Sequence, residues 1–319
     1  MPYPGRKGPL PLPIVKVTAS LAIVEQLASE NRRALSDWRA LLLLRRATEA
    51  LPPTQRRWDK APVSLTQMYP YLRQMRMRGE IAQISVQPVL HIYEVKVPYA
   101  RMAPLAEDEV LMEAHPYATL AYLSALAFHG LTEELPKEIL ALAPAQGTGE
   151  LMPPGTHRED WEELALVRGS LVRRILGRTV TWFRVAPRHY FGLGEYRPRG
   201  YPVRVTTPER TLLDGLLHPD LCGGIEVVLR AWALAYDTLD LDLLVRYVDQ
   251  FGIGVLRQRA GFILDELGLA HPALEQWRVA AKRGGSSKLV AATPYAPIYS
   301  ERWSLSLNAP LTALHEGKS

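Results

Sequence analysis

The chain has 319 residues, 47% of them hydrophobic, and a formal net charge of +5. This length exceeds that of one ordinary domain, so we expect roughly two or three domains. No apolar run reaches the ~18 residues that a membrane helix needs, so we expect a soluble protein without a membrane partner. The first residues lack the apolar core of a signal peptide, which favours a cytoplasmic location. The single cysteine, Cys222, excludes an internal disulfide and a cysteine-based zinc site, and the histidines show no metal-binding spacing. We therefore expect neither a metal nor a cofactor.

The positive charge is concentrated at the beginning of the chain. Residues 1–100 contain 15 Lys and Arg against 7 Asp and Glu, a net charge of +8, which leaves −3 for the other 219 residues. A basic module joined to a near-neutral remainder is typical of nucleic-acid-binding proteins. The charge alone leaves open the alternative that these side chains are simply solvated.

Residues 14–100 carry the pattern of a small DNA-binding domain. Before them, residues 1–13 hold five prolines and are expected to form a flexible tail. Apolar spacing, caps and breakers then predict two helices, one or two short helices around Pro70, and two strands with a turn at Gln87–Pro88. These elements are expected over residues 17–34, 36–51, 64–78, 81–86 and 89–97.

This order of elements, with Gly79 between the arginine-bearing helix and the hairpin, is that of a winged helix-turn-helix. In that fold the helix before the hairpin enters the major groove, and the hairpin lies against the DNA backbone. Glutamine and arginine can make bidentate contacts to bases, and arginine also binds phosphates. The candidate DNA-binding residues are Ser64, Gln67, Tyr71, Arg73, Gln74, Arg76, Arg78, His91 and Lys96. The alternative is a small helical domain whose arginines are solvated.

The remainder, residues 101–319, is predicted to be a larger mixed α/β domain with a small sheet and several helices, so that the whole chain is α+β. Residues 98–116 are expected to be a linker with an acidic patch, and residues 145–157 a loop. Helices are predicted over residues 117–128, 161–176, 208–217, 225–236, 241–251 and 255–267. Strands are predicted over residues 137–143, 180–185, 203–205, 288–292 and 303–307, with a hairpin loop over 192–200.

The most sharply defined helix of this domain begins after Thr207, a natural N-cap. Pro208 suits the first helical position, where its missing N–H costs no hydrogen bond, and Glu209 interacts favourably with the positive helix end. Arg210 and Asp214 are four residues apart and are expected to pair on the helix surface. Local chemistry therefore accounts for this segment without a catalytic role.

Several motifs in the second domain resemble those of the AbiEi family, the antitoxin and transcriptional-repressor half of AbiE-type (type IV) toxin–antitoxin systems. In chain order they are SALAFHGL (124–131) followed by the strand KEILALAP, TPERTLLD (207–214), HPDLCGGIEVVLRA (218–231) and WSLSLN (303–308). The resemblance covers about residues 117–310, whereas the N-terminal third is similar in general plan only.

The resemblance implies a transcriptional autorepressor whose winged helix-turn-helix binds double-stranded DNA at inverted repeats in its own promoter. It also implies that residues 101–319 form an antitoxin domain, which counteracts a nucleotidyltransferase-like toxin without a stable complex. A stand-alone winged-helix regulator without a toxin is an alternative.

A Mg²⁺-dependent nuclease is the alternative from a different class. Glu209, Asp214, Asp220 and Glu226 are carboxylates close in sequence, and nucleases hold Mg²⁺ with such groups. Helix starts and surface pairs explain Glu209 and Asp214 without catalysis, and no lysine follows at the spacing of a nuclease motif. We therefore predict no catalytic residue and no enzyme. His129 is interpreted as a structural residue near a helix end.

Overall fold

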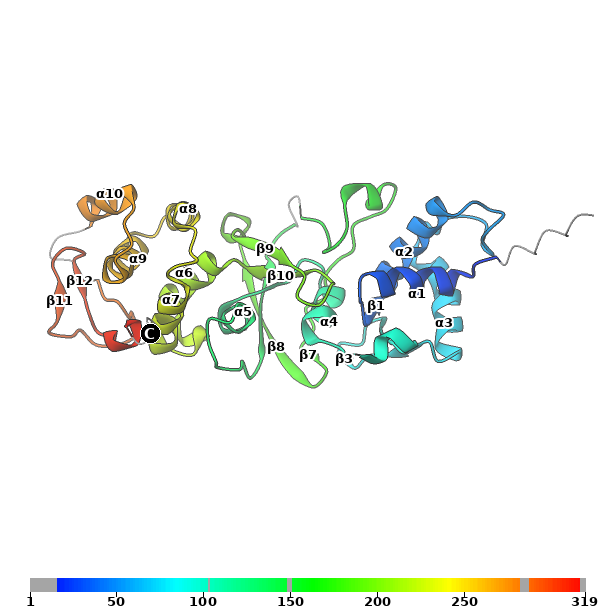
Figure 1. Ribbon diagram of the computed structural model, residues 1–319, viewed down its shortest axis with the longest axis horizontal. Coiled ribbons are helices and arrows are strands. Elements are labelled where there is room, and N and C mark those ends of the chain that lie inside the picture. Colours follow the sequence, from blue (N-terminus) through cyan, green and yellow to red (C-terminus); the bar gives the residue numbers. More distant parts are fainter. Residues whose placement is uncertain (1–15, 103, 148–150, 282–286, 316–319) are drawn as a thin grey trace, which may run out of the picture.

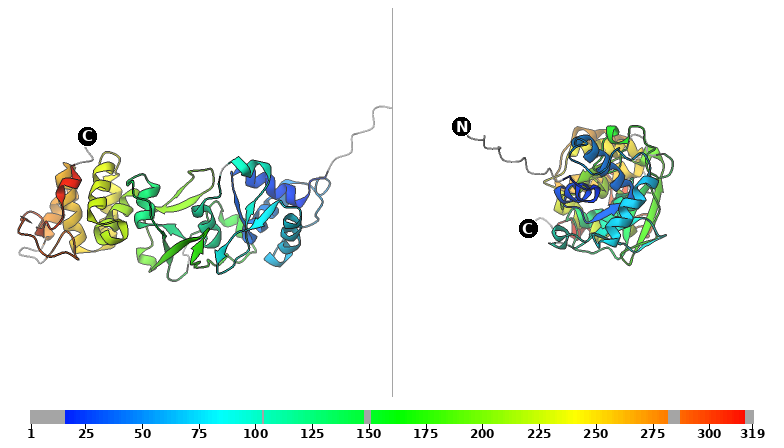
Figure 2. Two further views of the ribbon diagram at one scale, coloured as in Figure 1. Left: turned by 90° about the horizontal axis from the view of Figure 1, so that it is seen from below. Right: turned by 90° about the vertical axis from the view of Figure 1, so that its right-hand side faces the viewer.

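The computed structural model describes residues 16–102, 104–147, 151–281 and 287–315, so the tail expected over residues 1–13 lies outside it. The fold is mixed α+β, as predicted. The molecule is elongated: an N-terminal module, a central sheet and a group of C-terminal helices follow one another along the long axis (Figures 1 and 2). Within the described ranges, no helix is long and apolar enough to cross a membrane.

The N-terminal module (residues 16–102) packs helices against a small antiparallel sheet. Its helical elements are α1 (Ala19–Ser29), α2 (Asp37–Ala50), the 3-10 turn η1 (Leu65–Met68), α3 (Tyr69–Met77) and the 3-10 turn η2 (Pro98–Met102). Its sheet contains β1 (Ala34–Ser36), β2 (Ile81–Gln83) and β4 (Ile92–Val95) in the order β1-β4-β2. The side chains of Thr18 and Ser36 cap α1 and α2 by accepting backbone N–H groups, which fixes where both helices begin.

Three elements in this module differ from the prediction, and one of them is the strand expected over residues 89–97, which shortens to β4 (Ile92–Val95). The helix expected over residues 17–34 ends at Ser29, because Asn31 adopts a left-handed conformation (φ 53°) that terminates it before β1. The strand expected over residues 81–86 ends at Gln83, and Val86–Gln87 form a separate strand, β3. β3 pairs with a strand of the central sheet, so the turn of the hairpin is joined to the next part of the molecule.

The central part is a seven-stranded mixed sheet in the order β3-β7-β8-β6-β5-β10-β9. Its remaining strands are β5 (Thr119–Leu120), β6 (Ile139–Pro144), β7 (Arg174–Ile175), β8 (Arg178–Val185), β9 (Leu193–Tyr196) and β10 (Val203–Thr206). β6 runs parallel to β8 and β5 parallel to β10. β9 and β10 form an antiparallel hairpin. The hairpin loop predicted over residues 192–200 is therefore correct only in part, because Leu193–Tyr196 is strand β9 and the connecting loop follows it.

The linker predicted over residues 98–116 is wrong, because this segment contains helix α4 (Glu107–Ala114). Its acidic residues do not form an exposed patch: Glu109 and Glu113 are buried together with Val110 and Leu111. Carboxylates in a first helical turn favour a helix start, and their burial depends on partners from a distant part of the chain.

The helix predicted over residues 161–176 is also wrong. A 3-10 turn, η3 (Arg158–Trp161), is followed by irregular chain and then by the β7–β8 hairpin. Leu176 and Gly177 both have positive φ values, the two-residue turn that joins antiparallel strands, so hairpin chemistry outweighs the apolar spacing. A side chain at Gly169 would collide with the His115 ring, which explains the close packing of this segment on the sheet.

The C-terminal part is a cluster of helices around the largest apolar core. Its helices are α5 (Tyr122–Phe128), α6 (Pro208–Leu217), α7 (Ile225–Ala235), α8 (Leu241–Phe251), α9 (Gly254–Leu267) and α10 (Pro272–Ala280). The helices α6 to α9 agree with the prediction, whereas α10 was not predicted. The helix predicted over residues 117–128 shortens to α5, because Thr119–Leu120 form strand β5 of the central sheet. The strand expected over residues 288–292 forms only an isolated bridge from Lys288 to Ser306, and the strand expected over 303–307 shortens to β12 (Leu305–Ser306), which pairs with β11 (Tyr299–Ser300).

Candidate nucleic-acid interface

Helix α3 is amphipathic, and its apolar side is fixed by the module core. Leu72 and Met75 are buried, and so is Met68 in the turn before the helix. Pro70 lies in the first turn of α3, where its missing N–H has no helical acceptor, so it begins the helix rather than interrupting it. The opposite side of α3 is therefore directed away from the core.

That outward side carries arginine and glutamine side chains next to exposed tyrosine, proline and methionine side chains. We call it the α3 face, defined by Tyr69, Pro70, Arg73, Gln74, Met77 and Arg78, which border one shallow hollow. All six residues are exposed, and Met77 is 79% accessible. Of the predicted DNA-binding residues, the structure brings together Arg73, Gln74 and Arg78 on this face.

The arginines of α3 differ in the charges around them. Arg73 and Arg76 form no ion pair within the described part of the chain, whereas the Arg78 guanidinium lies 3.9 Å from a carboxylate oxygen of Glu80. The Arg76 guanidinium lies 5.9 Å from the centre of the Tyr93 ring, on the neighbouring hairpin. A cation without a counter-charge remains available to bind an external anion.

The other predicted residues are distributed around α3 rather than on its outer face. The His91 ring lies 5.4 Å from the tyrosine ring of the α3 face, so the hairpin passes close to the start of the helix. Lys96 binds a neighbouring glutamate at 2.6 Å. The Gln67 side chain accepts a backbone N–H at 2.8 Å, Tyr71 is half-buried against the core, and Ser64 borders a different cleft.

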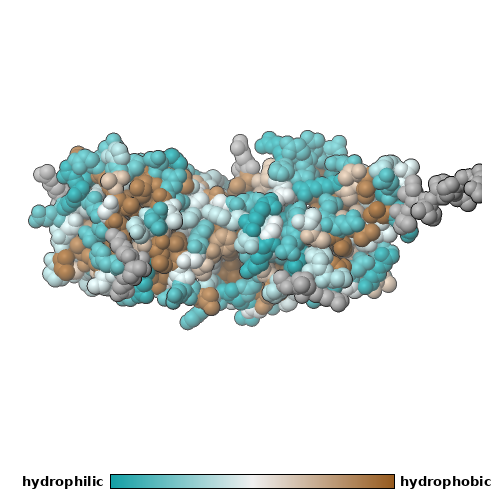
Figure 3. Space-filling view, in the orientation of Figure 1, coloured by the Kyte–Doolittle hydropathy of each residue, from teal (hydrophilic) through white to brown (hydrophobic). Residues whose placement is uncertain are grey.

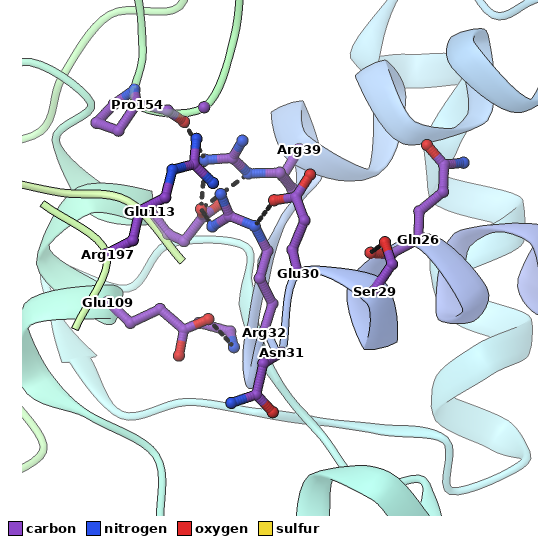
Figure 4. Close-up of polar contacts among 12 residues, drawn as sticks. Gln26, Ser29, Glu30, Asn31, Arg32, Arg39, Glu109, Glu113, Pro154 and Arg197 are labelled. Carbon is purple, nitrogen blue, oxygen red and sulfur yellow. Dashed lines mark hydrogen bonds and ion pairs between the residues drawn. The ribbon is translucent and has the colours of Figure 1, made fainter. Parts of the chain in front are cut away.

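A buried cluster of charges, which no sequence pattern indicated, joins the N-terminal module to α4 (Figure 4). Arg39 donates from Nε to Oε1 of Glu113 at 3.0 Å, and Arg32 donates to the same oxygen from 3.3 Å. The other oxygen of Glu113 accepts the N–H and the hydroxyl of Ser36, the N-cap of α2. Because these side chains are almost fully buried, each depends on the others for compensation of its charge or polarity.

Glu109, one helical turn earlier in α4, binds the edge of β1. Its Oε1 accepts the backbone N–H groups of Arg33 and Ala34 at 2.8 and 3.0 Å. Its Oε2 is buried and has no hydrogen-bond partner within the described residues. Burial raises the pKa of Glu109 to about 7, although the two backbone hydrogen bonds and the nearby Arg32 act in the opposite direction.

Three of the four carboxylates weighed as nuclease ligands, Glu209, Asp214 and Glu226, have partners within the chain. Arg210 and Asp214 pair as predicted, at 2.9 Å, but they are buried rather than on the surface. The Arg210 guanidinium lies 4.4 Å from the centres of both the Phe191 and Phe251 rings, so the loop before β9 and the end of α8 cover the pair. Burial raises the pKa of Asp214, while the Arg210 charge lowers it.

Two further residues of this region hold the backbone in place. Glu209 accepts the N–H of Asp240 at 3.2 Å, which joins the start of α6 to the start of α8. The ring nitrogen Nε2 of His129 lies 2.7 Å from the Thr206 carbonyl oxygen, and its N–H donates there, which agrees with the structural role predicted for it. Within the described residues, no group of three His, Cys, Asp or Glu side chains is arranged to hold a metal ion.

Comparisons with known proteins define the fold rather than the chemistry. No family model matches the chain, and no curated protein matches it. The crystal structure of the RV2827C protein from Mycobacterium tuberculosis is similar, with a TM-score of 0.50 and 14% sequence identity. The similarity covers 96% of this chain and 97% of that one, so it concerns the fold of nearly the full length of both.

Proposed function

We propose that this protein is a cytoplasmic, sequence-specific DNA-binding protein that represses its own promoter and acts as an antitoxin. In this proposal residues 14–100 are a winged helix-turn-helix, α3 is the helix that enters the major groove, and double-stranded DNA with inverted repeats is the partner. The proposal contains no catalytic step.

The observation that carries the DNA-binding half is the α3 face. Arg73 and Gln74 lie on an exposed helix that is followed by an antiparallel hairpin, and these residue types make the contacts that distinguish bases in the major groove. The pairing of β1 with β4, and of β4 with β2, supports a winged arrangement of the hairpin. The exposed cations of α3, Arg73 and Arg76, supply attraction for phosphates, whereas Arg32 and Arg39, which also count toward the net charge of +8 over residues 1–100, are buried with Glu113.

The antitoxin half of the proposal rests on the resemblance to the AbiEi family over about residues 117–310. It assigns residues 101–319 to counteracting a nucleotidyltransferase-like toxin without a stable complex. The buried positions of Arg210 and Asp214 support the view that the TPERTLLD motif maintains the fold of this part.

A fluorescence-anisotropy titration tests the proposal directly. The full chain is titrated against duplex DNA from the region upstream of its own gene and against scrambled duplexes of equal length, at several salt concentrations. We expect a preference for the upstream region and a steep loss of affinity with salt, because phosphate contacts release counterions. Equal affinity for both duplexes would contradict the repressor function.

Co-expression with a nucleotidyltransferase-like protein encoded next to the gene tests the antitoxin half of the proposal. Growth arrest that this chain does not relieve would contradict it.

A further inference from the structure

A cleft of about 580 Å³ opens where the N-terminal module meets the segment of residues 161–170. We call it the junction cleft. Its volume lies within the range of about 300–1,000 Å³ that is typical of small-molecule sites. Its walls are mainly apolar and come from both sides of the junction: Trp38, Leu41, Leu65 and Leu90 from the module, and Trp161, Leu164, Leu166 and Val167 from the facing segment.

Two tryptophans at the base of the junction cleft are held in fixed positions. The rings of Trp38 and Trp161 lie with their centres 6.0 Å apart and their planes inclined by 33°. The indole N–H of Trp38 donates to the Glu113 carbonyl oxygen at 3.0 Å, and that of Trp161 donates to the Thr156 hydroxyl at 2.9 Å. Both polar N–H groups are satisfied within the protein. Both side chains are otherwise buried, and the Arg39 guanidinium lies 4.2 Å from the centre of the Trp38 ring, so only the parts of these rings that border the cleft are left to contact an apolar group.

The junction cleft also contains a carboxylate, Asp37, that no Lys or Arg side chain of the described residues pairs with. Asp37 lies at the first position of α2 and accepts the N–H of Trp38 at 2.7 Å. The surrounding walls partly bury Asp37, and this desolvation raises its pKa, although the His91 ring on the same wall acts to lower it. Of the other charged residues at the cleft, Glu113 is already paired with buried arginines, and Arg168 is exposed to solvent.

We propose that the junction cleft binds a small amphipathic organic cation, with its apolar body against Trp38 and Trp161 and its ammonium group on the Asp37 carboxylate. A partly desolvated carboxylate gains most from a cation that reaches it, and aromatic faces attract cations as well as apolar groups. The ligand would contact both sides of the junction at once. Because Ser64 and Leu65 also border the cleft, it would lie against the turn that leads into α3.

Isothermal titration calorimetry of the full chain with three indoles tests this inference. The three probes share one ring system and differ in charge: tryptamine is a cation, N-acetyltryptamine is neutral and indole-3-propionate is an anion. We expect tryptamine to bind about tenfold more tightly than N-acetyltryptamine, and indole-3-propionate to bind most weakly. The Asp37→Asn variant should bind tryptamine and N-acetyltryptamine equally, since the amide keeps the hydrogen bond to the Trp38 N–H and loses only the charge. The Arg168→Ala variant, changed at the other free charge of the cleft, should keep the preference for the cation.

Each other outcome overturns the inference. Absence of binding by all three probes would exclude the cleft as a site for such ligands. A preference for indole-3-propionate that Arg168→Ala removes would show that the cleft selects anions. An unchanged preference in Asp37→Asn, with a circular dichroism spectrum like that of the wild type, would place the cation elsewhere. No DNA is present in this experiment, so its result is independent of the proposed function.

Discussion

At the scale of single residues, the arginines of α3 divide into those that already have a counter-charge and those that do not. Arg73 is exposed on the α3 face and forms no ion pair with a described residue. If it contacts a base, Arg73→Ala should weaken binding to the upstream duplex by about 1–3 kcal/mol. If it contacts only a phosphate, the variant should instead reduce the slope of the salt dependence by about one.

The matched control for that measurement is Arg246→Ala, which removes the same charge from an exposed position on α8. Fluorescence anisotropy should show little change for this variant. Wild-type affinity and salt slope in both Arg73→Ala and Arg76→Ala would mean that another surface reads the DNA.

Glu109 gives a pH dependence whose sign can be worked out. Its pKa is raised from 4.5 to about 7 in the folded chain, so the folded state binds more protons than the unfolded state between these values. The contribution of the Glu109 pKa shift to the free energy of unfolding is therefore fully present below about pH 4.5 and is lost as the pH rises through 7. The free energy of unfolding lost over this range is on the order of 3 kcal/mol.

Glu109→Gln isolates this effect, because the amide keeps an oxygen for the N–H groups of β1 and cannot ionise. Thermal denaturation of both proteins between pH 5 and pH 8 should show the variant gaining stability relative to the wild type as the pH rises. A stability difference that stays constant over this range would show that Glu109 has an ordinary pKa.

Which single residues could be predicted from the sequence depended on whether their partners were local. The pairing of Arg210 with Asp214 followed from a spacing of four residues, but its burial did not. The role of Arg39 could not be predicted, because the carboxylate that compensates it lies 74 residues away. Arg32 has a local partner in Glu30, at 2.5 Å, but its contact with Glu113 spans 81 residues and could not be predicted either. In a sequence, charges of this kind are indistinguishable from solvated arginines, and here they contributed to a net charge that was interpreted as a DNA-binding signal.

At the scale of elements, the N-caps of α1 and α2 offer a matched comparison. Both Thr18 and Ser36 accept a backbone N–H of their helix, but Ser36 also donates its hydroxyl to the buried Glu113. Thr18→Ala should cost about 1 kcal/mol, the typical value of a cap. Ser36→Ala should cost about 1–3 kcal/mol more, since it also removes a hydrogen bond to a buried charge.

Urea denaturation followed by far-ultraviolet circular dichroism measures both variants under the same conditions. Equal losses of stability would indicate that the Ser36–Glu113 contact adds nothing beyond ordinary capping. A larger loss in Thr18→Ala would contradict the role of α4 in holding the start of α2.

The helices with strong local signals were predicted well, and the elements that depend on distant contacts were not. Thr207, Pro208 and Glu209 define the start of α6 from adjacent residues alone. By contrast, α4 was mistaken for an acidic linker, because its polar sequence gives no sign of the buried partners in the N-terminal module. The apolar residues between Trp161 and Ile175 were interpreted as one helical face, yet they pack separately on the sheet and around the junction cleft.

At the scale of the whole molecule, the contact between the N-terminal module and the central sheet is held by buried groups rather than by a flexible connection. The apolar core around α4 includes Ala34, Ile84 and Ile92 of the module. Glu113→Ala leaves Arg39 buried without an ion-pair partner among the described residues, whereas Arg32 keeps its contact with Glu30 at 2.5 Å. Removing one partner of a buried pair typically costs about 3–5 kcal/mol. We expect this variant to loosen both sides of the contact together.

Hydrogen exchange measured by mass spectrometry distinguishes this from a local effect. In Glu113→Ala, peptides from β1, α2 and α4 should all exchange faster than in the wild type, whereas α9, which packs in the separate C-terminal core, should not change. Glu226→Ala, which breaks an exposed pair on α7, should leave all these peptides unchanged. Faster exchange confined to α4 would mean that the module does not depend on this contact.

The long sequence separations across this contact bear on how the chain is made. Arg39 pairs with a carboxylate 74 residues later in the chain, and Arg46 binds Asp160, which is 114 residues later. Strand β3 can pair only after β7 has been synthesised. Chains usually fold from the N-terminus as they leave the ribosome, one unit at a time. Here the first unit emerges with arginines that cannot be buried until the central sheet has been synthesised. Native packing of the N-terminal module therefore follows translation of more than half of the chain, and a nascent protein stalled before that point would carry these cations in water.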